Sequence, residues 1–338
     1  MSSASTSSSK AQGTTKPTTA KTTNYSKQKD DPAVVPQIVS RYYKVECEFD
    51  AHDGEVNAIR WSPSGLQFAS GGGDKTVKLW RPSEGKWKCT ETLIGSNAGI
   101  MSLDFDLMET FIVGAAKDGA SRVWDIRDFI LKQTLSGHYK EVTAAKFLTD
   151  SHKIVSGSHD RTIKIWDLQR GSCIHTMDAL SSCNDLVTMN GTNILSGHFD
   201  HRLRFWDTRT NKPTNEVLLQ ERVTSLDIST EKMTLLCSTR NDTLEVFDLR
   251  KNQIVTALEH DDFRVPCDWS RAVFSQDASY AMAGSSNGAV FIFNIKTGKV
   301  EDILQKHTNP VVACSWHSSL LLSCEKLRKT ILWRSVDH

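Results

Sequence analysis

The sequence predicts an all-β fold: a seven-bladed β-propeller with a disordered N-terminal tail. Aromatic residues with similar flanks recur at intervals of 40 to 46 residues, at Trp80, Trp124, Trp166, Trp206, Phe247, Phe293 and Trp333. An Asp or Asn stands six positions before each of the first six, and only the last unit, with Leu327, breaks this rule. Between turn and aromatic, apolar and polar residues alternate as in a strand. Such a period, with four strands per unit, is that of the WD repeat.

The chain divides into residues 1–40 and a propeller over 42–335. The first segment is rich in Ser, Thr and Lys and is interrupted by proline. It offers too little apolar surface to offset its ordering entropy, so we expect a disordered linker. The last unit ends at Trp333, too near the C-terminus for a fourth strand. We predict that the strand-like run 42–49 closes the ring as the outer strand of the last blade.

Charge and composition exclude several classes of function. The 41 basic and 40 acidic residues nearly balance, which argues against nucleic-acid binding. The eight cysteines are scattered in apolar runs without a C-x-x-C pair, which fits small buried side chains better than a metal site. The sequence contains neither an apolar run of membrane-spanning length nor a signal peptide, so we expect a cytosolic protein that does not insert into membranes.

Two units carry His, Ser, Asp and Trp at matched spacing. They are His52, Ser70, Asp74 and Trp80 in the first unit, and His138, Ser156, Asp160 and Trp166 in the third. A hydrolase would also need an exposed nucleophile and an oxyanion hole, for which the sequence has no motif. We expect instead a hydrogen-bonded chain that pins each turn to its strands. The prediction is a protein that is not an enzyme and needs no cofactor.

The remaining units hold degraded copies of this set. The second has Gly95-Ser96 where a Gly-His pair would stand, and the fourth has Ser196, Asp200 and Trp206 without a matching His. His198 and His201 lie three apart, but no third ligand is near, so we expect no metal there.

Function is therefore expected on a surface. In a propeller, the residue before each turn Asp and the residue entering each innermost strand gather at one end of the channel. The first set is Gly73, Lys117, His159, Phe199, Arg240, Ser286 and Lys326. The second is approximately Glu55, Gly99, Glu141, Asn184, Arg222, Asp268 and Pro310.

Phe199 is the one aromatic residue in these two sets. An exposed ring among polar residues marks a contact site, with Arg222 and Arg240 supplying charge and Asn184 a hydrogen-bonding group. The alternative is that Phe199 folds back over its own blade. The sequence leaves both interpretations open.

Unusual segments carry a family resemblance. The runs "GSNAGI" at 95–100, "SSCND" at 181–185 and "SGHFDHRLRFWD" at 196–207 resemble the C-terminal propeller of the autophagy-related protein 16-like family, over residues 45–333. The resemblance implies a docking platform for cytosolic tails of membrane proteins, the vacuolar proton pump and autophagy machinery. The resemblance also implies that this platform directs lipid conjugation of ubiquitin-like proteins to autophagosome precursors and endolysosomal membranes. The family's face carries an Asn, a Phe and a basic residue, matched by Asn184, Phe199 and Arg222, the last usually Lys.

Full-length relatives begin with a helix and a heptad coiled coil, and residues 1–41 show neither pattern. The sequence looks like the propeller of the family with a stub of linker, and we expect a monomer. A short isoform, a paralogue and a fragment all fit.

A rival interpretation is a substrate receptor of a cullin-based ubiquitin ligase. Propellers that dock its adaptor carry a W-D-x-R pattern, which here ends at Arg127 and again at Arg209. The plainer reading is a surface arginine after a strand.

Overall fold

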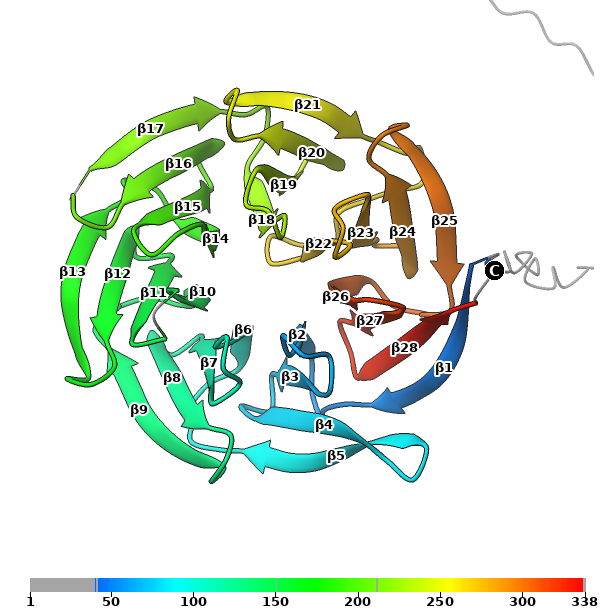
Figure 1. Ribbon diagram of the computed structural model, residues 1–338, viewed down its shortest axis with the longest axis horizontal. Helices are drawn as coiled ribbons and strands as arrows, with labels where there is room; N and C mark the ends of the chain where they lie inside the picture. Colours follow the sequence, from blue (N-terminus) through cyan, green and yellow to red (C-terminus); the bar gives the residue numbers. More distant parts are fainter. Residues whose placement is uncertain (1–39, 41, 150, 211, 337–338) are drawn as a thin grey trace, which may run out of the picture. The chain divides into compact units, whose positions relative to one another are not determined.

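A computed structural model describes residue 40 and residues 42–149, 151–210 and 212–336. Within these residues, 28 strands form seven four-stranded antiparallel sheets. The sheets are arranged around a central axis as the blades of a propeller (Figure 1). The predicted seven-bladed fold is confirmed. The tail expected to be disordered lies outside the described residues, apart from Ser40.

Each blade runs from an innermost strand at the channel to an outermost strand at the rim. The innermost strands are β2 (Val56–Trp61), β6 (Ile100–Phe105), β10 (Val142–Phe147), β14 (Cys183–Thr188), β18 (Val223–Ile228), β22 (Ala272–Phe274) and β26 (Val311–His317). The second strands are β3 (Phe68–Gly72), β7 (Phe111–Ala116), β11 (Lys153–Ser158), β15 (Asn193–His198), β19 (Thr234–Thr239), β23 (Tyr280–Gly284) and β27 (Leu320–Glu325).

The third strands carry the repeated aromatic residues. They are β4 (Val77–Ser83), β8 (Ala120–Asp125), β12 (Thr162–Asp167), β16 (Arg202–Asp207), β20 (Thr243–Asp248), β24 (Ala289–Asn294) and β28 (Lys329–Ser335). The outermost strands are β5 (Lys86–Leu93), β9 (Ile130–Ser136), β13 (Ser172–Asp178), β17 (Pro213–Leu218), β21 (Gln253–Leu258), β25 (Lys299–Gln305) and β1 (Tyr43–Asp50). Blades 1 to 7 are numbered by the order of their innermost strands.

Blade 7 combines both ends of the propeller. Its strand order is β1-β28-β27-β26, and β1 runs antiparallel to β28 from Tyr43 opposite Ser335 to Asp50 opposite Lys329. The first strand lies beside the last in Figure 1. The guanidinium of Arg334 donates to both carboxylate oxygens of Glu46, at 2.7 and 2.9 Å. Pairing of the two ends leaves neither β1 nor β28 without a neighbour inside the blade.

A bulge recurs at the start of the innermost strands. In blade 4 the pairing of β14 with β15 shifts between Cys183 and Asp185, so Asn184 is the extra residue. The same shift occurs in blade 1 around Asn57. A bulge re-aims the side chain of its extra residue, and this decides the role of Asn184.

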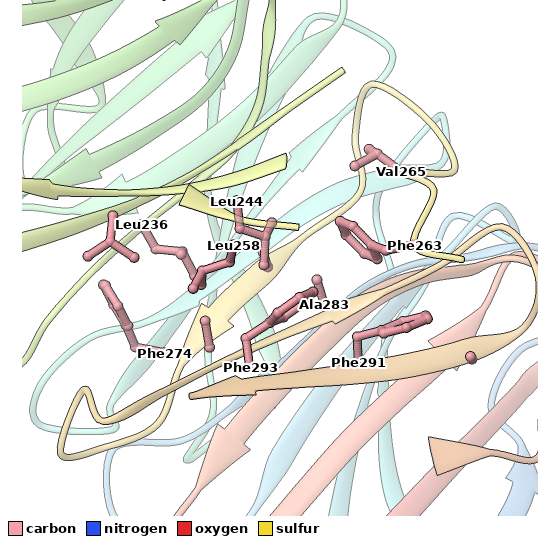
Figure 2. Close-up of a cluster of buried hydrophobic side chains, with 13 residues drawn as sticks. Leu236, Leu244, Leu258, Phe263, Val265, Phe274, Ala283, Phe291 and Phe293 are labelled. Atoms are coloured by element: carbon pink, nitrogen blue, oxygen red, sulfur yellow. The ribbon is translucent and has the colours of Figure 1, made fainter. Parts of the chain in front are cut away.

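Blade 6 departs from the repeat because its innermost strand has only three residues, Ala272–Phe274. The segment before it, residues 259–271, leaves the sheet. Phe263 and Val265 of this segment are buried in the core between blades 5 and 6, shown in Figure 2. The ring of Phe263 lies 5.4 Å from Phe291 and 5.6 Å from Phe293. These contacts anchor the N-terminal part of the segment.

Candidate functional site: one face of the propeller

The His, Ser, Asp and Trp residues that recur at matched spacing in blades 1 and 3 lie together in each blade. In blade 1 the His52 ring contacts Asp74 through Nδ1 at 2.9 Å and Ser70 through Nε2 at 2.8 Å. The indole N–H of Trp80 donates to the same hydroxyl at 2.9 Å. In blade 3 the corresponding distances among His138, Asp160, Ser156 and Trp166 are each 2.8 Å. Ser70 and Ser156 are completely buried, so neither hydroxyl is placed to attack a substrate.

Two further blades build related networks from other positions. In blade 7 the Ser323 hydroxyl lies 2.7 Å from His307 Nε2 and accepts from the Trp333 indole at 2.8 Å. Glu325 takes the role that Asp74 and Asp160 have in blades 1 and 3, with a carboxylate oxygen 3.3 Å from His307 Nδ1. Sequence reasoning missed this set because the turn position holds Leu327. The signal was the Ser-to-Trp spacing of ten, shared with blades 1 and 3.

In blade 4 the histidine comes from the strand itself. His198 Nε2 lies 2.7 Å from the Ser196 hydroxyl, which also accepts from the Trp206 indole at 2.7 Å. Burial, reinforced by the nearby Arg204, lowers the pKa of His198 to about 4, so the ring is neutral at pH 7. His201 instead lies near the surface, 3.7 Å from Glu221. Among the described residues no cluster of three or more metal-ligating side chains occurs.

Phe199 is 49% exposed, so about half of its surface is accessible to a partner. Its position follows from the turn between β15 and β16, where the Phe199 N–H donates to the Ser182 carbonyl at 3.0 Å. The guanidinium carbon of Arg222 lies 4.8 Å from the ring centroid, a cation–π geometry. The neighbouring blade therefore supplies charge beside the exposed ring, as the sequence suggested.

Asp268 joins the two arginines of this face. One of its oxygens lies 3.3 Å from Arg222 Nε and 3.4 Å from Arg240 Nε. Arg240 also donates to the Val265 carbonyl at 2.5 Å. All three side chains remain about one-third exposed. The pair of positive charges is thus held together by a carboxylate from the segment 259–271.

Asn184 differs from the expectation. Asn184 is only 3% exposed, and its side-chain amide donates to the Val223 carbonyl of blade 5 at 2.7 Å. Asn57 makes the equivalent bond to Ile100 of blade 2 at 3.0 Å. The expectation of an exposed hydrogen-bonding group was wrong because the bulge turns this side chain toward the next blade. Asn184 therefore links blades 4 and 5 through this hydrogen bond and lies beneath the exposed surface of the face.

A pocket of about 600 Å³ opens on this face, from Phe199 on blade 4 to Lys117 on blade 2. Its lining includes Lys140, His159, Asn184 and Asp268. The pocket was not foreseen, because its lining combines residues of blades 2, 3 and 4 with Asp268 of the segment 259–271.

Sequence reasoning also missed Trp269. The ammonium groups of Lys117 of blade 2 and Lys326 of blade 7 both lie over its ring, 5.7 and 5.8 Å from the centroid. Two residues further on, Arg271 donates to the Thr143 carbonyl of blade 3 at 2.9 Å and pairs with Asp185 of blade 4. Together with the contacts of Asp268 to blade 5, the segment from blade 6 thus reaches across the channel mouth to five other blades. Its one sequence signal was the longest aromatic interval, between Phe247 and Phe293.

Arg127 and Arg209 follow third strands. Each pairs with the aspartate two residues before it: Arg127 with Asp125 at 2.6 Å, and Arg209 with Asp207 at 2.5 Å. Their side chains are 65% and 74% exposed. Successive turns of an antiparallel sheet alternate between its two ends, so these arginines lie at the opposite end of the blades from Phe199. Arg250 repeats the arrangement with Asp248, which gives the pattern a role in closing the turn.

Across the part of the chain that the structure describes, no helix is long and apolar enough to cross a bilayer.

Comparison with known proteins agrees with this architecture. The family described as "WD domain, G-beta repeat" matches residues 43–81, 87–125 and 129–167. Mouse protein Atg16l2 is 42% identical over 88% of this chain and 49% of its own length. Autophagic-related protein 16.2 of Caenorhabditis elegans is 36% identical over 86% of this chain and 56% of its own. Protein tipD of Dictyostelium discoideum is 35% identical over 86% and 48%.

The chain therefore spans about half the length of these curated relatives. The similarity extends over most of the propeller, well beyond the three matched repeats. On this ground the chain belongs to the WD-repeat proteins of the autophagy-related protein 16-like family.

Proposed function

We propose that the chain is a non-enzymatic interaction scaffold in autophagy and that the face around Phe199 docks its protein partners. The observation that carries the proposal is the half-exposed Phe199 ring under the Arg222 guanidinium. Aromatic residues and arginines dominate the binding energy of protein interfaces. The name of the worm relative, autophagic-related protein 16.2, supplies the cellular process.

The finer part of the proposal concerns partners and place. The partners are cytosolic tails of membrane proteins or the vacuolar proton pump. Docking brings the cytoplasmic protein peripherally to autophagosome precursors and endolysosomal membranes, where lipid conjugation of ubiquitin-like proteins takes place. The propeller acts as a monomer.

The test is affinity purification with mass spectrometry, comparing wild type with Phe199→Ala/Arg222→Ala. The matched control is Ile254→Ala/Arg250→Ala, an exposed apolar residue and an exposed arginine on blade 5. We expect endolysosomal membrane proteins or pump subunits with wild type and control but not with the face variant. Equal recovery by all three proteins would refute the docking face.

A second candidate, a substrate receptor of a cullin-based ubiquitin ligase, rests on the exposure of Arg127 and Arg209. In that case Arg127→Ala and Arg209→Ala reduce co-purification of the ligase adaptor, whereas Phe199→Ala does not.

A further inference from the structure

The pocket beside Phe199 is lined by two lysines, Lys117 and Lys140. Of its acidic residues, Asp268 lies between Arg222 and Arg240, and a Glu141 oxygen lies 3.8 Å from the His159 Nδ1 atom. Among the described residues, neither Lys117 nor Lys140 has a carboxylate oxygen within ion-pair distance. Both ammonium groups therefore remain available to pair with the carboxylate of a partner.

Lys117 is also held in place. Its ammonium lies over the Trp269 ring, and Lys326 lies over the same ring. Trp269 comes from a segment anchored by the buried Phe263 and by the contact of Arg271 with blade 3. A positioned cation binds an anion with less loss of side-chain entropy than a free surface lysine.

We propose that this pocket binds an extended acidic peptide segment, with an apolar side chain against Phe199 and an aspartate or glutamate carboxylate at Lys117 and Lys140. The inference rests on the docking face proposed above and names the chemistry of its partner. Both ends are needed: the exposed ring supplies apolar contact, and the two lysines supply charge-assisted hydrogen bonds.

Charge distribution favours a peptide over a lipid surface. Glu141 and Asp268 lie in the same pocket as the lysines, and the whole chain carries a formal net charge of only +1. Anionic membranes attract clusters of several lysines and arginines without interspersed acids. A concave site with mixed charges fits the separate side chains of one peptide.

The first experiment selects random displayed peptides on the full chain and resynthesises the enriched ones with every Asp and Glu changed to Asn and Gln. We expect enriched peptides to contain an acidic and an apolar residue, and neutralisation to weaken binding roughly tenfold. With Lys117→Gln/Lys140→Gln, the acidic and neutral peptides should bind almost equally. Lys86→Gln/Lys251→Gln, which removes two exposed lysines elsewhere, should behave as wild type.

Each other outcome overturns the inference. Enrichment of no peptide, or of peptides without acids, contradicts an acidic partner. Acid dependence that persists in Lys117→Gln/Lys140→Gln places the carboxylate elsewhere. Lysine-dependent sedimentation with phosphatidylserine vesicles, together with no peptide binding, assigns the lysines to a membrane.

Phe199→Ala separates the two proposals. Binding lost in Phe199→Ala, with acid dependence unaffected by the lysines, leaves the docking face standing and removes this inference. Binding unaffected by Phe199→Ala but dependent on both lysines removes the apolar contact from the proposed face.

Discussion

The Arg222 guanidinium of blade 5 lies 4.8 Å from the centre of the Phe199 ring of blade 4, while Asp268 of blade 6 contacts the same arginine. Three blades thus meet at one exposed ring. A half-exposed aromatic side chain contributes less to the stability of the fold than the buried rings of the core do.

Phe199→Ala is expected to leave stability within about 0.5 kcal/mol of wild type, because exposed side chains contribute little. Thermal denaturation of the two proteins measures the difference. A fall of several degrees in Tm would instead show that the ring covers its own blade.

Ser156→Ala should destabilise the propeller by about 1–3 kcal/mol. The substitution leaves the buried Trp166 indole N–H without its acceptor and His138 without a partner at Nε2. Urea denaturation measures the loss, with the exposed Ser172→Ala as control. Equal stability of both variants would show that the network does not pin the turn.

The free energy of unfolding should fall as pH drops from 6.5 toward 4, partly through His198. Its pKa is lowered from 6.5 to about 4 by burial, reinforced by Arg204 and opposed by Asp200. Between these values the unfolded chain binds more protons than the fold, so stability decreases with acidification, by at most about 3 kcal/mol for this group.

Denaturant titrations at a series of pH values measure this slope. His198→Gln should flatten it, whereas His201→Gln, near the surface, should not. An unchanged slope in His198→Gln would assign the acid sensitivity to other groups, such as His52 and His307, whose pKa values burial also lowers.

Deletion of residues 42–49 should destabilise the ring, whereas deletion of residues 1–35 should not. The first deletion removes nearly all of β1, including Phe49, whose ring lies 4.3 Å from Trp80. Loss of that contact alone costs on the order of 2 kcal/mol. Melting curves of the two truncated proteins decide the point, and an unchanged curve for the first would contradict closure by β1.

The sequence predicted the features that repeat. Seven aromatic residues in register predict seven blades, and a matched spacing predicts which side chains meet His52 and His138. A repeat supports such predictions because each unit is compared with six others. The repeat pattern also predicted that Phe199 and Arg222 lie on one face, because the turn position is the same in every blade.

Features that occur once, or that depend on an exact backbone register, were not predictable in this way. Asn184 occupies a position expected at the surface, but a one-residue bulge turns it inward. Trp269 has no counterpart in the other units, so no comparison within the chain marks it. Glu325 serves blade 7 from the end of β27, two residues before the turn position where an acid was sought.

The union of β1 with β28 also bears on how the protein is made. A ribosome delivers β1 at the start of the propeller and β28 at its end, so β1 lacks its native neighbour until nearly the whole ring has been synthesised. During that time an unpaired strand edge is open to pairing with other chains. Completion of the ring is therefore a late event in biosynthesis, and the edge of β1 stays exposed to such pairing until blade 7 is complete.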